Sequence, residues 1–270
     1  MTSSSESVAG DRLVTVGELT IHDVPFDETV RRIQQWATER SGGYVCTPNA
    51  DYVVRSRHDT EFRRAVQDAR LRVPDGMWLV YASRIAGRGL HGTVTGRLLL
   101  PAIAEVAADR GLRIALFGAG AGIAERVRGA LMRSHPQLEV VAAVTPPTPF
   151  RIGSESDRHA VDAIRETNPD VLFVALGAPK QEIWMQRHAA ELGGAVSVGV
   201  GGAFDIVAGR FRESPRWMTR HGLEWLFRLA QEPRRLARRY LLDDPWILWW
   251  AIRTRLAGRR VRNQPPTARP

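Results

Sequence analysis

The residues best suited to chemistry follow a short apolar run at 171–176, which reads Val-Leu-Phe-Val-Ala-Leu. Such a run is too short for a free-standing helix and is typical of a strand buried on both faces of a parallel sheet. A glycine and a proline end the strand, and a helix is expected to begin at Lys180. This order of elements directs unpaired N–H groups and a positive dipole end at an anion. Because Lys180 is the only lysine beside 37 arginines, we interpret this turn as half of an anion-binding site made of Gly177, Lys180, Gln181 and Glu182.

A carboxylate and a hydroxyl follow two other predicted strands. Asp75 lies in a Pro-Asp-Gly turn, and a carboxylate at a strand end can act as a general base toward a sugar hydroxyl. The same triplet is also a common structural turn. Thr47 precedes a proline, which holds it extended, so that its hydroxyl can point into a crevice. Asn49 is a candidate substrate contact, although its simpler role is to cap the next helix.

Two glycine-rich loops supply the remaining candidates on the predicted sheet. The loop at 118–122 resembles part of a dinucleotide-binding fingerprint, but Ile123 stands where the third glycine would be. A phosphate contact and a plain tight turn both remain open for this loop. The loop at 201–205 ends in an aspartate that could instead cap a helix. The candidate binding residues of the two loops are Gly118, Gly120, Gly201, Gly202 and Asp205.

The pattern of cysteines, histidines and carboxylates does not indicate a metal site. Cys46 is the only cysteine, which excludes an internal disulfide and a cysteine cluster, and suits a reducing compartment. The histidines show no ligand spacing, and no Asp-x-Asp triplet occurs. Paired carboxylates that would hold a divalent cation are therefore not expected. The sequence predicts a site with neither metal nor another cofactor.

The elements that must position these residues alternate between strand and helix. Expected strands are 13–16, 19–21, 44–46, 71–73, 112–117, 138–144, 171–176 and 195–200, and expected helices are 26–39, 50–57, 60–69, 77–85, 98–110, a stretch up to Arg133, 155–167 and 180–188. This spacing predicts an α/β fold with a Rossmann-like, mostly parallel sheet and helices on both faces. Ligands of such sheets bind outside the carboxyl ends of the strands. All the polar and glycine motifs follow predicted strands, so we expect one crevice to collect them.

The C-terminal part differs in charge from the rest of the chain. Residues 209–270 hold 15 arginines against five acidic residues, together with five of the eight tryptophans. Basic, tryptophan-rich helices are expected near 223–229 and 246–260, and this composition suggests a phosphate-bearing or anionic lipid surface. We therefore expect a catalytic domain at 11–208, a basic helical membrane-associating appendage at 209–262, and disorder at 1–10 and 263–270. Neither a signal-peptide pattern nor an apolar run long enough to span a bilayer is present.

Five motifs in this order resemble the WecG/TagA/CpsF family of bacterial glycosyltransferases over residues 16–240. They are Thr-Pro-Asn at 47–49, Val-Pro-Asp-Gly at 73–76, Gly-Ala-Pro-Lys-Gln-Glu at 177–182, Gly-Val-Gly-Gly-Ala-Phe-Asp at 199–205 and Gly-Leu-Glu-Trp-Leu-Phe-Arg at 222–228. The resemblance implies an inverting, metal-independent transfer of a sugar from a UDP donor to a polyprenyl-diphosphate-linked sugar. The enzyme would work in cell-envelope or exopolysaccharide synthesis, in the cytoplasm and peripherally on the inner face of the cell membrane.

The resemblance also implies roles for individual residues. Asp75 matches the family's proposed base, and Thr47 and Gln181 match residues of its catalytic pocket. Family arginines that close over the donor diphosphate correspond to Arg228, Arg235 and Arg238. The chain departs from the family at 93–98, where Thr93 and Leu98 replace the usual arginine and aspartate of an Arg-x-Thr-Gly-x-Asp motif. Arg88 or Arg97 could supply the missing charge.

Two other classes of protein are weighed against this one. A nucleotide-dependent oxidoreductase would need the missing third glycine of the 118–122 loop. A basic protein that binds a nucleic-acid phosphate backbone would use the arginine-rich tail, but would leave the motifs at the strand ends unexplained, and no nucleic-acid partner is expected. A homo-oligomer is compatible with the sequence, which leaves the oligomeric state open along with the donor sugar, the acceptor and the polymer.

Overall fold

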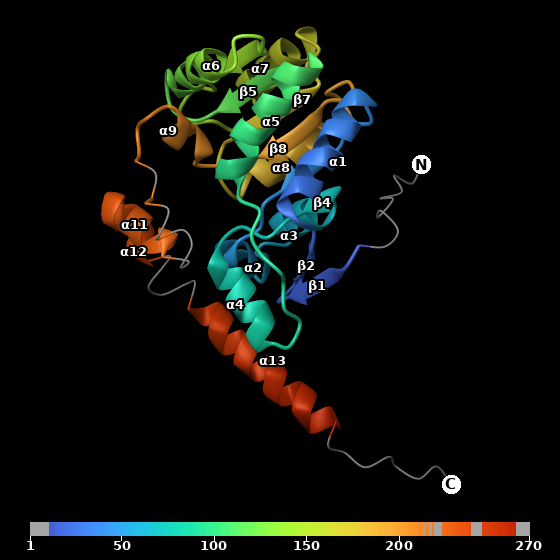
Figure 1. The fold of residues 1–270 in the computed structure, drawn as a ribbon, viewed down its shortest axis with the longest axis vertical. Helices are drawn as coiled ribbons and strands as arrows, with labels where there is room; N and C mark the ends of the chain where they lie inside the picture. The colour runs from blue at the N-terminus through green and yellow to red at the C-terminus, as the bar shows by residue number, and fades with distance from the viewer. Residues whose placement is uncertain (1–10, 213, 216–217, 219–222, 239–244, 263–270) are drawn as a thin grey trace.

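Six parallel strands form the central sheet of the computed structural model, in the order β4-β3-β8-β7-β5-β6 (Figure 1). Their bounds are β3 (Tyr44–Cys46), β4 (Leu71–Arg72), β5 (Arg113–Gly118), β6 (Glu139–Val144), β7 (Val171–Ala175) and β8 (Val196–Gly199). All five residues of β7 are buried, as expected for a strand covered on both faces. The structure describes residues 11–262 except 213, 216–217, 219–222 and 239–244. The expected disorder at 1–10 and 263–270 lies outside the described residues.

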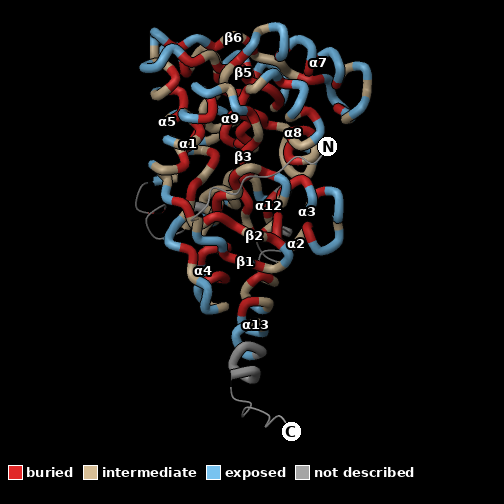
Figure 2. The backbone as a smooth tube through the Cα atoms, turned by 90° about the vertical axis from the view of Figure 1, so that its right-hand side faces the viewer, coloured by how far each residue is buried: buried red, intermediate tan, exposed pale blue. Residues whose placement is uncertain are grey.

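Helices cover both faces of this sheet and enclose two apolar cores. One core contains side chains of α1 (Phe26–Thr38), α5 (Gly96–Arg110), α6 (Ile123–Ser134) and α9 (Ala203–Val207). The other contains side chains of α7 (Glu155–Glu166) and α8 (Lys180–His188), and α3 (Thr60–Gln67) packs against α8 on this side. Figure 2 shows buried backbone running through the strands, with exposed segments at the outer turns. The Rossmann-like α/β architecture expected from the sequence is confirmed.

A buried polar cluster fixes α8 against α7. The carboxylate of Asp157 is fully buried and accepts hydrogen bonds from Trp184 Nε1 at 2.7 Å and from the Gly153 amide at 2.6 Å. His188 Nε2 lies 3.2 Å from the same carboxylate. A buried carboxylate that is paired in this way is costly to disrupt. The cluster therefore holds α8, and with it the turn that precedes α8, in a defined position at the end of the sheet.

A third core lies beyond the carboxyl ends of the strands. It joins the antiparallel hairpin of β1 (Leu13–Val16) and β2 (Leu19–His22) to α2 (Ala50–Ser56), α4 (Met77–Ile85) and α13 (Trp246–Arg262). Ile247 and Ala251 of α13 are fully buried in it, and α13 runs along α4 before extending away from the rest of the fold (Figure 1). The expected hairpin and the expected C-terminal helix are both present.

Two short helices, α11 (Glu224–Gln231) and α12 (Pro233–Arg238), follow α9 in the chain and precede α13. Trp225 of α11 packs against Trp78 of α4, with ring centroids 5.7 Å apart. The helical arginine pattern that the sequence shows from 223 through Arg235 and Arg238 is divided in the structure into α11 and α12. The short α9 after β8 begins before Asp205, the residue considered as a helix cap. None of the helices in the described ranges combines the length and apolar content needed to cross a bilayer.

Candidate active site

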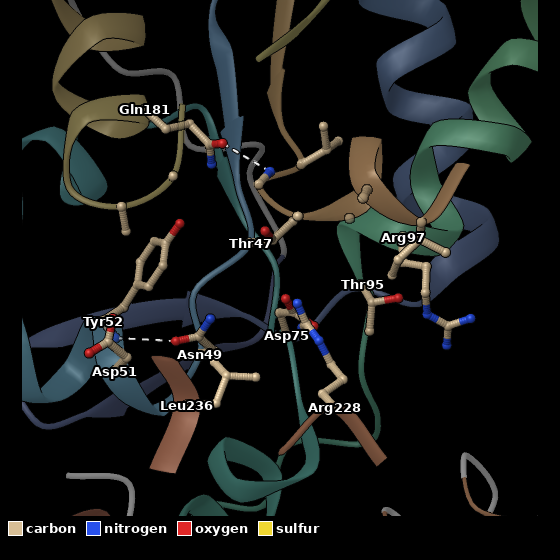
Figure 3. A pocket seen from close by; sticks show the side chains of 18 of the residues that line it. Thr47, Asn49, Asp51, Tyr52, Asp75, Thr95, Arg97, Gln181, Arg228 and Leu236 are labelled. Atoms are coloured by element: carbon tan, nitrogen blue, oxygen red, sulfur yellow. Dashed lines mark hydrogen bonds between the residues drawn. The ribbon is translucent and has the colours of Figure 1, made fainter. Parts of the chain in front are cut away.

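A cavity of about 390 Å³ lies at the carboxyl ends of β4, β3, β8 and β7 (Figure 3). The structure brings eight of the predicted site residues to its wall: Thr47, Asn49, Asp75, Gly177, Gln181, Gly201, Gly202 and Arg228. The remaining wall comes from Asp51, Tyr52, Arg55, Thr95, Gly96, Arg97, Ala178, Val200, Ala203, Ile206 and Leu236. Three arginines and two aspartates thus face one space, which suits a ligand with both anionic and hydroxyl groups.

Asp75 stands on a loop whose backbone is held by two hydrogen bonds. Its amide donates to the Pro48 carbonyl at 2.7 Å, and the Val94 amide donates to the Pro74 carbonyl at 2.7 Å. The next residue, Gly76, has φ +89°, and a Cβ there would meet no atom within 4 Å. Glycine is therefore required by backbone conformation and not by space. These constraints place the Asp75 carboxylate in the cavity between Asn49 and Thr95 (Figure 3).

Gln181 connects the helix α8 to the loop after β8. Its Oε1 accepts a hydrogen bond from the Gly201 amide at 2.9 Å, and its Nε2 donates to Glu182 Oε1 at 2.8 Å. An amide N–H can only donate and a carboxylate can only accept, so both contacts fix the orientation of the Gln181 amide. A Cβ at Gly199 would lie 2.5 Å from Gln181 Nε2, which explains why glycine ends β8. Thr47 lies beside this layer and donates its hydroxyl to the Gly199 carbonyl at 3.2 Å.

Glu182 lies behind the cavity wall and is fully buried. Its Oε1 accepts a 2.5 Å hydrogen bond from the Tyr52 hydroxyl as well as the bond from Gln181, while its Oε2 has no partner among the described residues. Burial raises the pKa of Glu182 from 4.5 to about 7, against the opposing effect of these hydrogen bonds and of the Arg55 charge. The residue therefore does not line the cavity itself and contacts the wall through Tyr52 and Gln181.

Arg228 reaches the cavity because α11 is held by the tryptophan contact. Trp225 and Arg228 are three residues apart and so lie on one side of α11. Trp225 packs on Trp78 of α4, and the guanidinium of Arg228 approaches Gly202 so closely that a Cβ there would lie 3.1 Å from Nη2. In Figure 3 the Arg228 guanidinium points toward Asp75. A cation from the C-terminal part thus lines the same cavity as the candidate base.

The N-terminus of α5 forms a further part of the wall. Gly96 begins this helix, and a Cβ there would lie 2.9 Å from Val200 Cα, so glycine permits the close approach of the two loops. The buried Thr95 Oγ1 has no hydrogen-bond partner among the described residues. The first turn of α5 carries no acidic residue, and Arg97 lies on the far side of the cavity from Tyr52 (Figure 3). The helix dipole and Arg97 make this end of the cavity attractive to an anion.

Lys180 does not line the cavity, contrary to the interpretation on which the anion site was first based. Its Nζ donates to the Phe150 carbonyl at 3.0 Å and ties α8 to the loop after β6. Successive residues of a helix point about 100° apart, so the turn that directs Gln181 into the cavity directs Lys180 elsewhere. The lysine therefore has a structural partner, and the cationic groups of the cavity are arginines.

The other predicted residues outside the wall are Gly118, Gly120, Asp205, Arg235 and Arg238. The strand order places β5 beyond β7, and a Cβ at Gly118 would lie 2.6 Å from the Ala175 backbone, so this glycine serves the packing of two strands. Asp205 lies within α9 and pairs with Arg210 at 3.2 Å, which also excludes the N-cap role considered for it. The side chains of Arg235 and Arg238 lie outside the part of the chain that the structure describes.

Sequence reasoning missed several wall residues, of which Tyr52 is the most important. Asn49 caps α2 by accepting from the Tyr52 amide at 3.4 Å, so the simpler interpretation of Asn49 holds while it also lines the cavity. Tyr52 and Arg55 follow on the next turn of this helix. Their spacing from Asn49, three and six residues, was an available signal. Arg97 was considered as a replacement charge and does line the cavity, whereas Arg88 is exposed and does not.

Comparison with known proteins identifies the family of this chain. The sequence profile described as the glycosyl transferase WecG/TagA/CpsF family matches residues 14–261. A Bacillus subtilis (strain 168) protein named N-acetylglucosaminyldiphosphoundecaprenol N-acetyl-beta-D-mannosaminyltransferase is 27% identical over 226 residues, which cover 81% of this chain and 86% of the relative. A Staphylococcus aureus (strain MW2) protein of the same name is 25% identical over 228 residues, covering 82% and 87%. The chain belongs to the WecG/TagA/CpsF family and is a glycosyltransferase.

Proposed function

We propose that this enzyme transfers a sugar from a UDP donor to a polyprenyl-diphosphate-linked sugar, with inversion at the anomeric carbon. The observation that carries the proposal is that Asp75, Gln181 and Arg228 line one cavity in a glycosyltransferase of this family. N-acetylmannosamine is the first donor sugar to test and a lipid-diphosphate-linked N-acetylglucosamine the first acceptor, because the relatives are named for that reaction.

Asp75 is the residue proposed to activate the acceptor. It would accept the proton of the acceptor hydroxyl as that oxygen attacks the anomeric carbon, which is the role of a general base. The other aspartate of the cavity wall, Asp51, forms an ion pair with Arg55 at 3.6 Å, one turn along α2. Asp75 is the preferred base because it stands in the Pro-Asp-Gly motif at 74–76, whereas Asp51 lies outside the motifs that resemble the family. A single displacement with one base inverts the anomeric configuration.

Arginines and backbone dipoles are proposed to stabilise the departing diphosphate. Arg228 can make bidentate contacts to phosphate oxygens, and Arg97 with the N-terminus of α5 offers a second anionic position. Such groups compensate the charge that develops as UDP leaves, which supports the proposal that the reaction needs no metal. Within the described residues, no cluster of three His, Cys, Asp or Glu side chains is placed to hold a metal ion.

We also propose that α13 places the enzyme on the cytoplasmic face of the cell membrane. Its inner side is buried against α4, whereas Trp249, Ile252 and Leu256 are 52%, 49% and 54% exposed. Spacings of three and seven residues put these side chains on one stripe of the helix. An exposed apolar stripe flanked by arginines is typical of a helix that lies in a membrane interface. The C-terminal residues 209–262 would then serve both the cavity and the membrane.

A transfer assay with a panel of UDP-sugars tests the reaction. Lipid-diphosphate-linked N-acetylglucosamine is supplied in detergent, and products are identified by mass spectrometry. The panel is needed because Thr93 and Leu98 depart from the family motif. We expect one preferred donor, with transfer to the acceptor. Absence of transfer from every UDP-sugar, with a folded protein, would contradict the proposal.

The membrane proposal needs a variant that leaves the core intact. Truncation before α13 would expose the apolar surface that Ile247 and Ala251 cover, so the double substitution Ile252→Gln and Leu256→Gln is preferable. We expect it to weaken flotation with anionic vesicles while the melting temperature stays within about 2 °C of the wild type. Unchanged flotation would exclude the stripe as the membrane contact.

A further inference from the structure

A second cavity lies between the β1–β2 turn, the end of α2 and the first turns of α13. It measures about 400 Å³ and is lined by Gly17, Glu18, Arg57, Trp246, Trp249, Trp250, Arg253 and Thr254. We call it the tryptophan groove. It shares no residue with the catalytic cavity, so the proposed transfer reaction leaves it without a role.

Two arginines of the tryptophan groove are held by stacking on indole rings. Arg57 Cζ lies 3.9 Å from the ring centroid of Trp246, and Arg253 Cζ lies 4.7 Å from that of Trp249. The two indole rings are themselves neighbours, with centroids 6.3 Å apart. Stacking restricts a guanidinium while leaving the N–H groups at its edge available for hydrogen bonds. The two guanidinium groups are thus prearranged at the groove, one from the end of α2 and one from α13.

These guanidinium groups have no anionic partner within the described part of the chain. Among the described residues, neither Arg57 nor Arg253 forms an ion pair or a side-chain hydrogen bond. Both side chains are exposed and line the groove. The acidic residue of the groove, Glu18, lies 3.8 Å from Arg63 on α3, which offsets its charge. The groove therefore presents two oriented cations without a protein carboxylate paired to them.

Phosphate is the anion that fits this arrangement. A phosphate group accepts several hydrogen bonds at once and matches the planar fork of arginine. Three tryptophans beside the arginines add apolar surface, and indole rings favour the level of lipid headgroups at a membrane interface. The exposed stripe of Ile252 and Leu256 continues from the groove along α13. On α13, a surface suited to a lipid headgroup, the tryptophan groove, is thus followed by a surface suited to hydrocarbon, the exposed stripe.

We propose that the tryptophan groove binds the phosphate of an anionic phospholipid headgroup, while the α13 stripe lies among the acyl chains. The proposal rests on the proposed peripheral membrane location and assigns it a specific headgroup site. A simpler role for the two stacked arginines is structural. Arg57 would hold α13 against the end of α2, and Arg253 would stabilise α13 through its contact with Trp249. That role predicts a loss of stability on their removal but no change in headgroup preference, and the experiment separates the two.

The test compares vesicle binding of the full chain with two matched pairs of substitutions. Arg57→Gln with Arg253→Gln removes the groove cations, and Arg126→Gln with Arg133→Gln removes two exposed arginines of α6. Both variants lose the same net charge. Vesicles of phosphatidylcholine with and without phosphatidylglycerol are used, and glycerol 1-phosphate serves as a soluble competitor. Melting temperatures are recorded for each protein.

We expect the wild type to prefer phosphatidylglycerol vesicles, and the groove variant to lose about thirtyfold in affinity for them, since each basic residue at an anionic surface contributes about fivefold. The α6 variant should stay within about twofold. Competition by glycerol 1-phosphate supports a headgroup site, whereas competition by inorganic phosphate alone would assign the groove to free phosphate and overturn the lipid proposal. Equal losses in both variants, or no preference in the wild type, would also overturn it. Wild-type transfer to an acceptor in detergent is measured in parallel, so a failed transfer proposal is recognised separately.

Discussion

Replacement of Glu182 by glutamine should stabilise the protein relative to the wild type as the pH rises from 5 to 8. The pKa of Glu182 is raised from 4.5 to about 7, chiefly because the carboxyl is buried. The new glutamine side chain would keep an Oε1 acceptor for the Tyr52 hydroxyl and for Gln181 Nε2, which both bind Glu182 Oε1 in the wild type. The substitution therefore removes the ionisation and preserves both hydrogen bonds.

The sign of the effect follows from proton binding. The folded protein holds the Glu182 proton more tightly than the unfolded chain, so its contribution to stability is fully present below pH 4.5 and is lost as the pH rises through about 7. One pKa unit corresponds to about 1.4 kcal/mol. The wild type should therefore lose about 2 to 3 kcal/mol of unfolding free energy between pH 5 and pH 8 through this group. That loss corresponds to about 5 °C in melting temperature for a chain of this size.

Urea unfolding followed by tryptophan fluorescence at pH 5, 6, 7 and 8 measures this difference. The control is Glu166→Gln, which alters an exposed glutamate near the end of α7. Because burial lowers the pKa of His22 from 6.5 to about 4 and so opposes the effect of Glu182, the quantity to compare is the difference from the wild type at each pH. We expect the Glu166 variant to keep the wild-type pH profile and the Glu182 variant to gain about 2 to 3 kcal/mol relative to the wild type from pH 5 to pH 8. A Glu182→Gln profile that runs parallel to the wild type would show that the buried carboxyl does not titrate in this range, and the reasoning would be refuted.

Four further perturbations test the cavity and its surroundings. Arg228→Ala should lower kcat by about 10²- to 10³-fold in the transfer assay, because it removes a contact to the departing diphosphate; a change below threefold would contradict that role. Gly199→Ala should lower kcat by at least about tenfold in a folded protein, since its Cβ would lie 2.5 Å from Gln181 Nε2 and displace the amide; circular dichroism checks the fold. Lys180→Met should lower the unfolding free energy by about 1 kcal/mol, because the hydrogen bond to the Phe150 carbonyl is lost, and should leave turnover within about twofold of the wild type. Addition of EDTA should leave transfer unchanged. A loss of transfer that Mg²⁺ restores would disprove metal independence.

The elements of this fold were predictable because their apolar patterns are strong. The buried run at 171–176 and the amphipathic run at 26–39 correspond to β7 and α1. Polar and glycine residues directly after strands then identified seven of the nineteen residues of the cavity wall, since the carboxyl ends of parallel strands share one edge. Asp75 and Thr47 were found by this rule alone, and the motif resemblance added Arg228.

The errors concern information that local patterns do not contain. The loop after β5 lies away from the cavity because of the order of the strands in the sheet. The residues of a glycine-rich loop do not indicate that order. The direction of a side chain around a helix axis separates Lys180 from Gln181, and a shift of one residue reverses the assignment. The pairing of Tyr52 with Glu182 joins residues 130 positions apart. Such contacts become visible only in the folded chain.

The most direct measurement of the central claim compares sugar transfer by the wild type and by Asp75→Asn. Labelled N-acetylmannosamine is supplied as its UDP donor, and lipid-diphosphate-linked N-acetylglucosamine is the acceptor. The affinity of both proteins for UDP is measured by calorimetry. The account predicts a β-linked disaccharide product from the wild type. It predicts that the variant binds UDP within about threefold of the wild type and loses at least about 10²-fold in turnover. Wild-type turnover in the Asp75→Asn protein, with the same donor and acceptor, would contradict the claim that this carboxylate activates the acceptor.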